Sequence, residues 1–281
     1  VKLLISNNQS DAEKLSKNID ELNEERRTLD EQTTKEATEM ISATPDFNTR
    51  KTIVVYNEEW SKGIVGIVAS RLAEEFYRPT IVLTRATNGL LSGSARSVQG
   101  FDLYAAIDSC RDLLENFGGH LYAAGLSLKE ENLEAFIEQF ERFVTENITK
   151  AQLTPQIEID AEVDFSRFNS KFFKNLKQFA PFGPGNANPV FCTRQVKDNG
   201  GTKVVGKASD HLKVDLCDLD GNHNMNGIAF HMSDYHDRMK ENVPIDLCYT
   251  LEENTFAAHH SDSKNGEVNM QLMVKDIRCN E

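Results

Sequence analysis

The stretch NFGGHLYAAGLSL, residues 116–128, sets two glycines directly before a histidine and follows them with a run of small residues. Because glycine has no side chain, the backbone at Gly118 and Gly119 can turn sharply and can come close to an anionic group. A plainer interpretation stays open beside this one. The two glycines can simply end the helix that DLYAAIDSCRDLLENF (102–117) predicts, which leaves His120 partly exposed at the turn.

On both sides of this stretch, segments typical of strands alternate with segments typical of helices. TIVVY (52–56) and PTIVLT (79–84) are short apolar runs, and GIVGIVASRLAEEF (63–76) between them has the spacing of an amphipathic helix. LEAFIEQFERFVTENI (133–148) predicts a closing helix. The pattern predicts an α/β fold class, with a domain over 47–152 in which helices pack on a mostly buried sheet.

The residue patterns on either side of this domain differ from those within it. Residues 8–43 contain no proline or glycine and carry apolar side chains at helical spacing, so we expect one long connector helix within 1–46 that bridges two globular bodies. Beyond Pro155 the apolar runs are short and alternating, with turn residues at Asn199-Gly200 and Asp220-Gly221. These runs predict five or six strands and one short helix, an OB-like β-barrel over 153–281.

Composition limits the classes of function. The formal net charge of −13 weighs against a bulk electrostatic grip on nucleic acid, although a few arginines in one cleft can still capture phosphates. The five cysteines are scattered and form no CxxC pair, so neither a disulfide framework nor a structural zinc site is expected. No segment resembles a signal peptide or a membrane span, which predicts a cytoplasmic protein without membrane association. The start at Val1 suggests a piece of a longer chain.

Two further segments could bind phosphate. SGSARS (92–97) places three hydroxyls and one arginine around a glycine where a strand is expected to end, and such groups bind phosphate oxygens, although an ordinary polar turn is equally consistent. Gly63 is expected at a helix start, which favours an anion, but close helix packing through Gly66 and Ala69 explains most of that segment. The pairs His231/His236 and His259-His260 have spacings that do not converge on one ion, so no metal site is expected.

Five motifs occur in a fixed order: SKGIVGIVASRL, RPTIVL, GSARS, GGHLYAAG and PFGPGNANPVF. In this series the chain resembles the C-terminal portion of the RecJ family of single-strand-specific DNA exonucleases. LNEERRTLDEQTTKEA resembles the connector helix that joins the catalytic DHH domain of this family to its DHH-associated domain. The resemblance implies a connector helix, a DHH-associated domain and an OB-fold, and it implies that the catalytic DHH domain lies outside these residues.

The resemblance also implies roles for particular residues. His120 would act in catalysis near the scissile phosphate, and the substrate phosphates would be bound by Ser94, Arg96, Ser97, Gly118 and Gly119. Further candidates for nucleic-acid contact are Lys62, Phe191, Lys203, Lys207, His211 and Lys213. Manganese or magnesium would be held by the missing DHH domain, so no cofactor is expected in this chain and the chain alone is expected to be inactive.

Single-stranded DNA is the partner that the resemblance implies, with a single-strand-binding protein or a helicase as a further partner. Two alternatives remain open. The chain could be the corresponding portion of a DHH-family phosphodiesterase for cyclic dinucleotides or very short oligonucleotides. It could also be a protein-interaction module, an option that the acidic charge supports.

Overall fold

The computed structural model describes residues 1–241, 243–254 and 270–279, and the chain forms two compact units, 1–156 and 157–281. Each unit has hydrophobic clusters of its own. The pair His259-His260, considered above for metal binding, lies outside the described residues. None of the helices in the described part of the chain is long and apolar enough to cross a bilayer.

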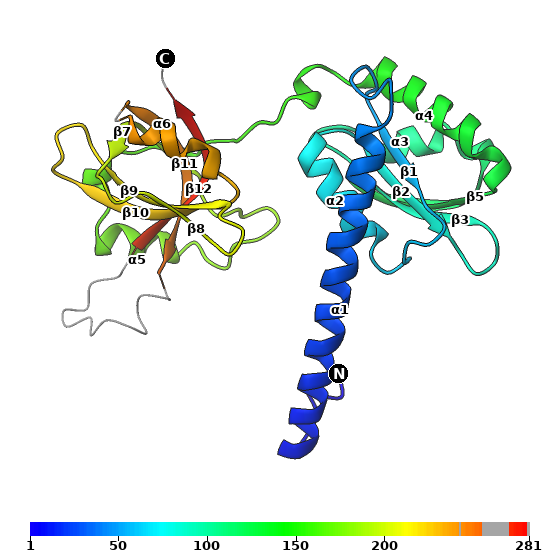
Figure 1. Cartoon of the computed structure of the whole chain (residues 1–281), viewed down its shortest axis with the longest axis horizontal. Coiled ribbons are helices and arrows are strands. Elements are labelled where there is room, and N and C mark those ends of the chain that lie inside the picture. Colours follow the sequence, from blue (N-terminus) through cyan, green and yellow to red (C-terminus); the bar gives the residue numbers. More distant parts are fainter. Residues whose placement is uncertain (242, 255–269, 280–281) are drawn as a thin grey trace. The chain divides into compact units, whose positions relative to one another are not determined.

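The long helix that the sequence predicts is α1 (Gln9–Ser42). It begins where the Asn8 side chain accepts hydrogen bonds from the backbone N–H groups of Ser10 and Asp11, which are free at a helix start. Only its C-terminal part is buried, through side chains such as Ala37 and Ile41. Figure 1 shows the remainder of α1 extending away from the sheet of the first unit.

The first unit is built on a mixed five-stranded sheet with the strand order β1-β2-β3-β5-β4. Its strands are β1 (Ile53–Tyr56), β2 (Thr80–Arg85), β3 (Leu91–Arg96), β4 (Leu114–His120) and β5 (Ala123–Leu128). β1 and β2 run parallel, while the other neighbours are antiparallel. The α/β class is confirmed.

Helices cover both faces of this sheet. α3 (Leu103–Asp108) and α4 (Leu133–Asn147) pack on one face in a cluster that contains Ile81, Ala95 and Leu126. α2 (Val65–Phe76) and the buried end of α1 pack on the other face, in a cluster that contains Ile53 and Val82. α2 contacts β2 and β3, so β5 and β4 continue the sheet beyond this helix.

The prediction of a helix through residue 117 is wrong. α3 ends at Asp108, a short 3-10 turn covers Arg111–Leu113, and the double glycine lies inside strand β4. The backbone from Leu114 to His120 pairs with β5, and this pairing decides the conformation against the local helical pattern. Residues 92–96 of the segment SGSARS lie within β3, which is paired on both sides up to Arg96, and only Ser97 follows the strand.

The second unit is an all-β barrel. Its strands are β6 (Ala161–Glu162), β7 (Phe191–Asp198), β8 (Lys203–Val205), β9 (His211–Cys217), β10 (Asn224–Ala229), β11 (Ile245–Glu253) and β12 (Met270–Cys279). The order is β6-β7-β11-β12-β10-β9-β8, and an additional β7–β9 pairing closes the ring. A small closed barrel of this kind is the OB-like architecture that the sequence predicts.

Three details of the barrel differ from expectation. The described residues form seven strands instead of five or six. The single short helix is in fact two helices, α5 (Ser170–Lys177) and α6 (His236–Lys240). The expected strand QIEIDAEV shortens to the two residues of β6.

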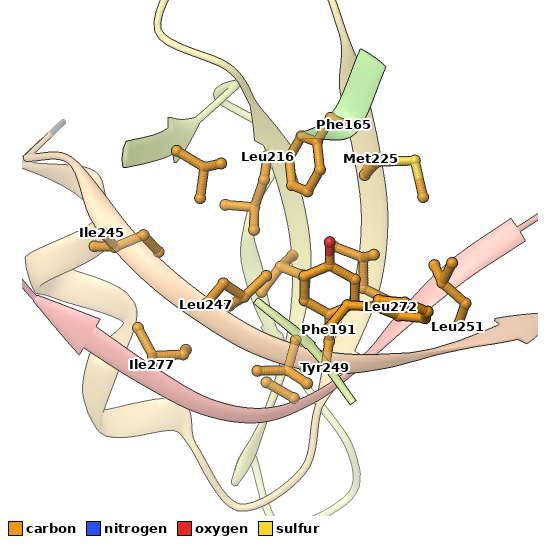
Figure 2. Packing of buried hydrophobic residues seen from close by; sticks show 14 of the residues in the cluster. Phe165, Phe191, Leu216, Met225, Ile245, Leu247, Tyr249, Leu251, Leu272 and Ile277 are labelled. Carbon is orange, nitrogen blue, oxygen red and sulfur yellow. The ribbon is translucent and has the colours of Figure 1, made fainter. Parts of the chain in front are cut away.

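Tyr249 lies at the centre of the barrel core, where it is fully buried and its hydroxyl is 2.5 Å from Thr193 Oγ1. Phe165 and Phe191 pack around it, and Figure 2 shows these rings gathered in the interior with Leu247. Phe191 is therefore wrong as a candidate for stacking on a base, since only 6% of its surface is exposed. The alternating pattern that marks β7 as a strand does not say which of its faces is inside.

Candidate functional site

The strand register places the two predicted key residues, Arg96 and His120, in one row across the sheet. Arg96 on β3 pairs with Ala123 on β5, and Ala123 pairs with His120 on β4. Directly paired residues project from the same face, and adjacent strands lie about 4.8 Å apart. The two backbones are therefore about 10 Å apart on one face of the sheet.

A second row lies two residues along the strands. Ser94 pairs with Gly125, which pairs with Gly118. Gly118 and Gly125 are exposed, so small residues form an open floor beside α2. We call this surface the shelf, and define it by the two rows together: Ser94, Arg96, Ala123, Gly125, Gly118 and His120.

Arg96 is held at the edge of α2. Its Nε donates to Ser70 Oγ at 3.0 Å, and its Nη1 donates to the Ala95 carbonyl at 2.8 Å. Burial lowers the pKa of the Arg96 guanidinium from its usual high value, and an arginine nonetheless stays charged at neutral pH. Within the described chain, Nη2 has no hydrogen-bond acceptor, so it can donate to an anion.

Gly66 on α2 faces this guanidinium. A Cβ at that position would lie 3.2 Å from both Arg96 Nη2 and Ser94 Oγ. The sequence marks Gly66 as a packing residue, whereas here its missing side chain also keeps the space before Arg96 and Ser94 open.

Arg96 lines a cavity of about 410 Å³ together with Ser70, Tyr77, Ser97, Gln99 and Tyr122. Ser70, Gly66 and Gly125 lie within the quoted motifs, but the sequence assigns them no part in binding. Their position beside Arg96 and Ser94 on the helix face or in the strand register reveals that part.

The two adjacent glycines of β4 have different reasons to be glycine. A Cβ at Gly119 would lie 2.3 Å from the Ala123 carbonyl oxygen and 2.5 Å from Ala124 Cα, so the strand pairing itself excludes a side chain. A Cβ at Gly118 would meet nothing within 4 Å. Gly118 therefore leaves space on the shelf, and Gly119 allows β4 to pair with β5.

His120 ends β4 with its side chain exposed. The Tyr122 backbone N–H donates to His120 Nδ1 at 3.4 Å. A neutral imidazole that accepts at Nδ1 carries its proton on Nε2. Nε2–H is thus available as a donor to a group that enters the shelf.

Three other predicted residues of the first unit lie outside the two rows. Ser97 follows β3; its hydroxyl donates to the Phe101 carbonyl at 2.9 Å, and the residue lines the cavity beside Arg96. Gly63 precedes the first residue of α2 by two positions, and its N–H donates to Ser61 Oγ at 3.4 Å. Lys62 is exposed in the same turn.

In the barrel, the predicted residues gather on the β8–β9 hairpin. Lys203 pairs directly with Lys213, and His211 lies two residues away on the same face. Lys207 is exposed in the loop between the two strands. Phe230, which the sequence analysis passes over, follows β10 with 48% of its surface exposed, and its ring packs 5.0 Å from that of His211. Phe230, unlike the buried Phe191, is therefore exposed enough to contact a nucleic-acid base.

The shelf suits an anion and does not fit manganese or magnesium. Its side chains are a guanidinium, a hydroxyl and an imidazole, whereas these hard cations prefer carboxylate and carbonyl oxygens. Among the described residues, one group of three or more His, Cys, Asp or Glu ligands comes together, namely Asp210, His211 and His231 in the barrel.

Comparison with known proteins gives matches for both units. The DHHA1 domain family matches residues 49–146, and the RecJ OB domain family matches residues 159–276. The single-stranded-DNA-specific exonuclease RecJ of Bacillus subtilis is 30% identical over 283 residues, and that of Salmonella typhimurium is 30% identical over 286 residues. These alignments cover 100% and 99% of this chain but only 34% and 47% of the relatives' length.

Crystal structures of RecJ from Thermus thermophilus, in complex with Mg²⁺ and with Mn²⁺, superpose on the chain with TM-scores of 0.74 and 0.75. The sequence identities are 23% and 24%, and the matches cover 100% of this chain and 40% and 38% of those chains. At this identity the likeness shows the fold. The two domain matches and the relatives that align along the whole chain show that it belongs to the RecJ family, of which it contains the DHHA1 and OB domains.

Proposed function

We propose that the shelf holds the phosphodiester backbone of single-stranded DNA in a RecJ-type exonuclease. The observation that carries this proposal is the register, which sets Arg96 and His120 on one exposed face with a floor of glycine and alanine between them. A side-chain-free floor lets a sugar–phosphate chain approach the sheet closely. The relatives' description as single-stranded-DNA-specific exonucleases supports the same substrate.

Each residue has a distinct role in this proposal. Arg96 Nη2 and Ser94 Oγ bind a phosphate in the space that Gly66 leaves open, with Ser97 at the rim. Gly118 provides room, and Gly119 sets the position of β4. His120 donates Nε2–H to a phosphate oxygen, where developing charge strengthens the hydrogen bond in the transition state.

Hydrolysis itself belongs, in this proposal, to the catalytic domain of the full-length enzyme, which would use manganese or magnesium. The crystal structures of RecJ with Mg²⁺ and Mn²⁺ support metal use by the whole protein. With DNA as its substrate, the proposed enzyme would act in the cytoplasm. The acidic chain can also contact a single-strand-binding protein or a helicase.

The barrel offers a contact surface of its own for single-stranded DNA. Lys203 and Lys213 provide paired positive charges on β8–β9, and Phe230 beside His211 offers a face for base stacking, worth about 1–3 kcal/mol per base. Lys207 and Lys62 are further phosphate contacts. The match to the RecJ OB family favours this long substrate over a cyclic dinucleotide.

The test uses full-length RecJ that carries this chain. His120→Ala should lower turnover about 100- to 1000-fold with little change in DNA affinity, whereas Arg96→Ala should weaken binding as well, because the guanidinium contacts phosphate before and during the reaction. Arg85→Ala is the matched control, since Arg85 is an arginine of the same sheet that pairs with Glu58 and Glu130. Turnover of folded His120→Ala within about threefold of wild type would contradict the role of this histidine.

The chain alone gives a second test. It should bind single-stranded oligonucleotides more tightly than duplex, with an affinity that falls as salt rises. It should release no nucleotides with manganese or magnesium. Chelator-sensitive nucleotide release by the pure chain, or equal affinity for single strands and duplex, would count against the proposal.

A further inference from the structure

We propose that Asp210, His211 and His231 form a zinc-binding site on the OB unit. Asp210 and His211 lie at the start of β9, and His231 follows β10, so two separate connections of the barrel meet there. The spacing of His231 and His236 in the sequence predicts no metal site, whereas the fold brings His231 to His211. The site lies on a different unit from the shelf and does not depend on the function proposed above.

The spacing of the three side chains matches a coordination shell. Asp210 Oδ1 is 3.1 Å from His211 Nδ1, and Oδ2 of the same carboxylate is 2.8 Å from His231 Nδ1. One ligand atom from each residue lies within 4.8 Å of the others. Tetrahedral zinc bonds of about 2.0–2.1 Å place neighbouring ligand atoms about 3.3 Å apart, so an ion fits with a small rotation of the exposed His231 ring.

Hydrogen bonding among these groups leaves a conflict that a cation relieves. The His231 backbone N–H donates to His211 Nδ1 at 3.2 Å, so this nitrogen has no proton for the carboxylate 3.1 Å away, and an ion bound at Nδ1 would replace this hydrogen bond. The pairs Asp218–His223 and Asp237–His236 differ, because each makes a direct ring-nitrogen hydrogen bond of 2.9 or 3.0 Å. Two electron-rich atoms that face one another without a shared proton are the arrangement that a cation stabilises.

The backbone around the site is also unusual. Ser209 and His231 both have φ of +55°, in the left-handed region that costs free energy for residues other than glycine. Residues held in this region cluster at ligand clamps. Ser209 directly precedes Asp210, and His231 is itself the third ligand, so two positions of the site have this conformation.

The donor set favours zinc over magnesium. Two imidazoles and one carboxylate are typical ligands of zinc and of its cobalt(II) substitute, whereas magnesium prefers an all-oxygen shell. Three protein ligands leave the remaining position for water or for a substrate oxygen. A bound ion would tie the β8–β9 loop to the segment after β10 and would fix Phe230 and His211 in place.

Zinc and cobalt(II) titrations of the whole metal-free chain test the site. We expect one zinc per chain, visible d–d absorption with cobalt(II), a rise in the melting temperature of the barrel, and no displacement by excess magnesium. His231→Gln and Asp210→Asn should each weaken zinc binding at least tenfold. The controls His223→Gln, from a two-residue pair, and the double change His259→Gln with His260→Gln should retain it.

Several outcomes would overturn the proposal. They are an absence of stoichiometric zinc binding, binding that survives His231→Gln and Asp210→Asn, and binding that is lost only in the His259/His260 variant. Circular dichroism of each variant separates loss of a ligand from loss of the fold. Asp210→Asn provides an independent check if His231→Gln disturbs the backbone, because it changes the charge and keeps the shape.

Discussion

At the scale of single residues, the double glycine shows that one motif can contain two separate requirements. Gly119 lies against the backbone of β5, whereas Gly118 opens onto the shelf. Gly119 is required for packing within the protein, whereas Gly118 leaves space for a ligand. A substitution at Gly119 should therefore lower stability, whereas a large side chain at Gly118 should lower the affinity for DNA.

Gly119→Ala should destabilise the first unit by about 1–3 kcal/mol, because its Cβ would overlap the Ala123 carbonyl. Gly118→Ala should leave stability within about 0.5 kcal/mol, and Gly118→Leu should reduce affinity for single-stranded DNA by filling the shelf. Urea unfolding and fluorescence anisotropy measure the two effects. Equal destabilisation at both positions would show that Gly118 is also required by the fold.

At the scale of elements, α1 is joined to α2 by a buried charge. The Asp30 side chain is 1% exposed, and Arg71 Nη2 lies 2.7 Å from its Oδ2. Nearby, the indole N–H of Trp60 donates to Glu36 on α1 at 2.9 Å. Because α1 buries few apolar side chains, these polar contacts fix its position on the first unit.

Arg71→Met should cost about 3 kcal/mol, because it leaves the buried Asp30 carboxylate without its charged partner. Asp30→Asn should cost less, since Arg71 is 46% exposed and can turn to water. The exposed pair Arg27–Glu31 on the same helix supplies the control Arg27→Met, with an effect near zero. Trp60 is the only tryptophan, so its fluorescence follows the detachment of α1 in urea. An Arg71→Met effect no larger than the control would contradict this prediction.

A second element contact should make the barrel sensitive to acid. Burial by itself raises the pKa of Asp198, but hydrogen bonds from Lys240 on α6 and from Thr202 outweigh it, so the pKa lies below its usual value. A carboxyl group with a lowered pKa in the folded state stabilises the fold above its unfolded pKa of about 3.9. That contribution disappears as the pH falls through the lower, folded pKa.

Asp198→Asn should therefore lower the stability of the barrel at pH 7 by about 1–3 kcal/mol and flatten its loss of stability below about pH 4. Thermal melts followed by circular dichroism across this range measure the difference. Asp237→Asn, at a side chain that is 99% exposed, is the control. An unchanged acid slope in Asp198→Asn would show that other carboxyl groups dominate acid unfolding.

At the scale of the whole molecule, two units with separate cores should fold separately. The hydrophobic clusters of the first unit are built from α1 to α4 and its sheet, and that of the second from the barrel strands with Phe165 and Phe173. Residues 1–156 and 157–281, made as separate chains, should each unfold cooperatively. Calorimetry of both pieces tests this, and a piece without a cooperative transition would show that its core depends on the other unit.

The sequence by itself determined α1, the α/β alternation of the first unit and the alternating strands of the barrel. Helical and strand periodicities are local, so residues a few positions apart are sufficient to reveal them. The tertiary structure decided that Gly118 and Gly119 lie in a strand, that Phe191 points into the core, and that Arg96 and His120 share a row. It also brought His211 to His231. These features depend on which distant strands pair and in what register, and local spacing does not contain that information.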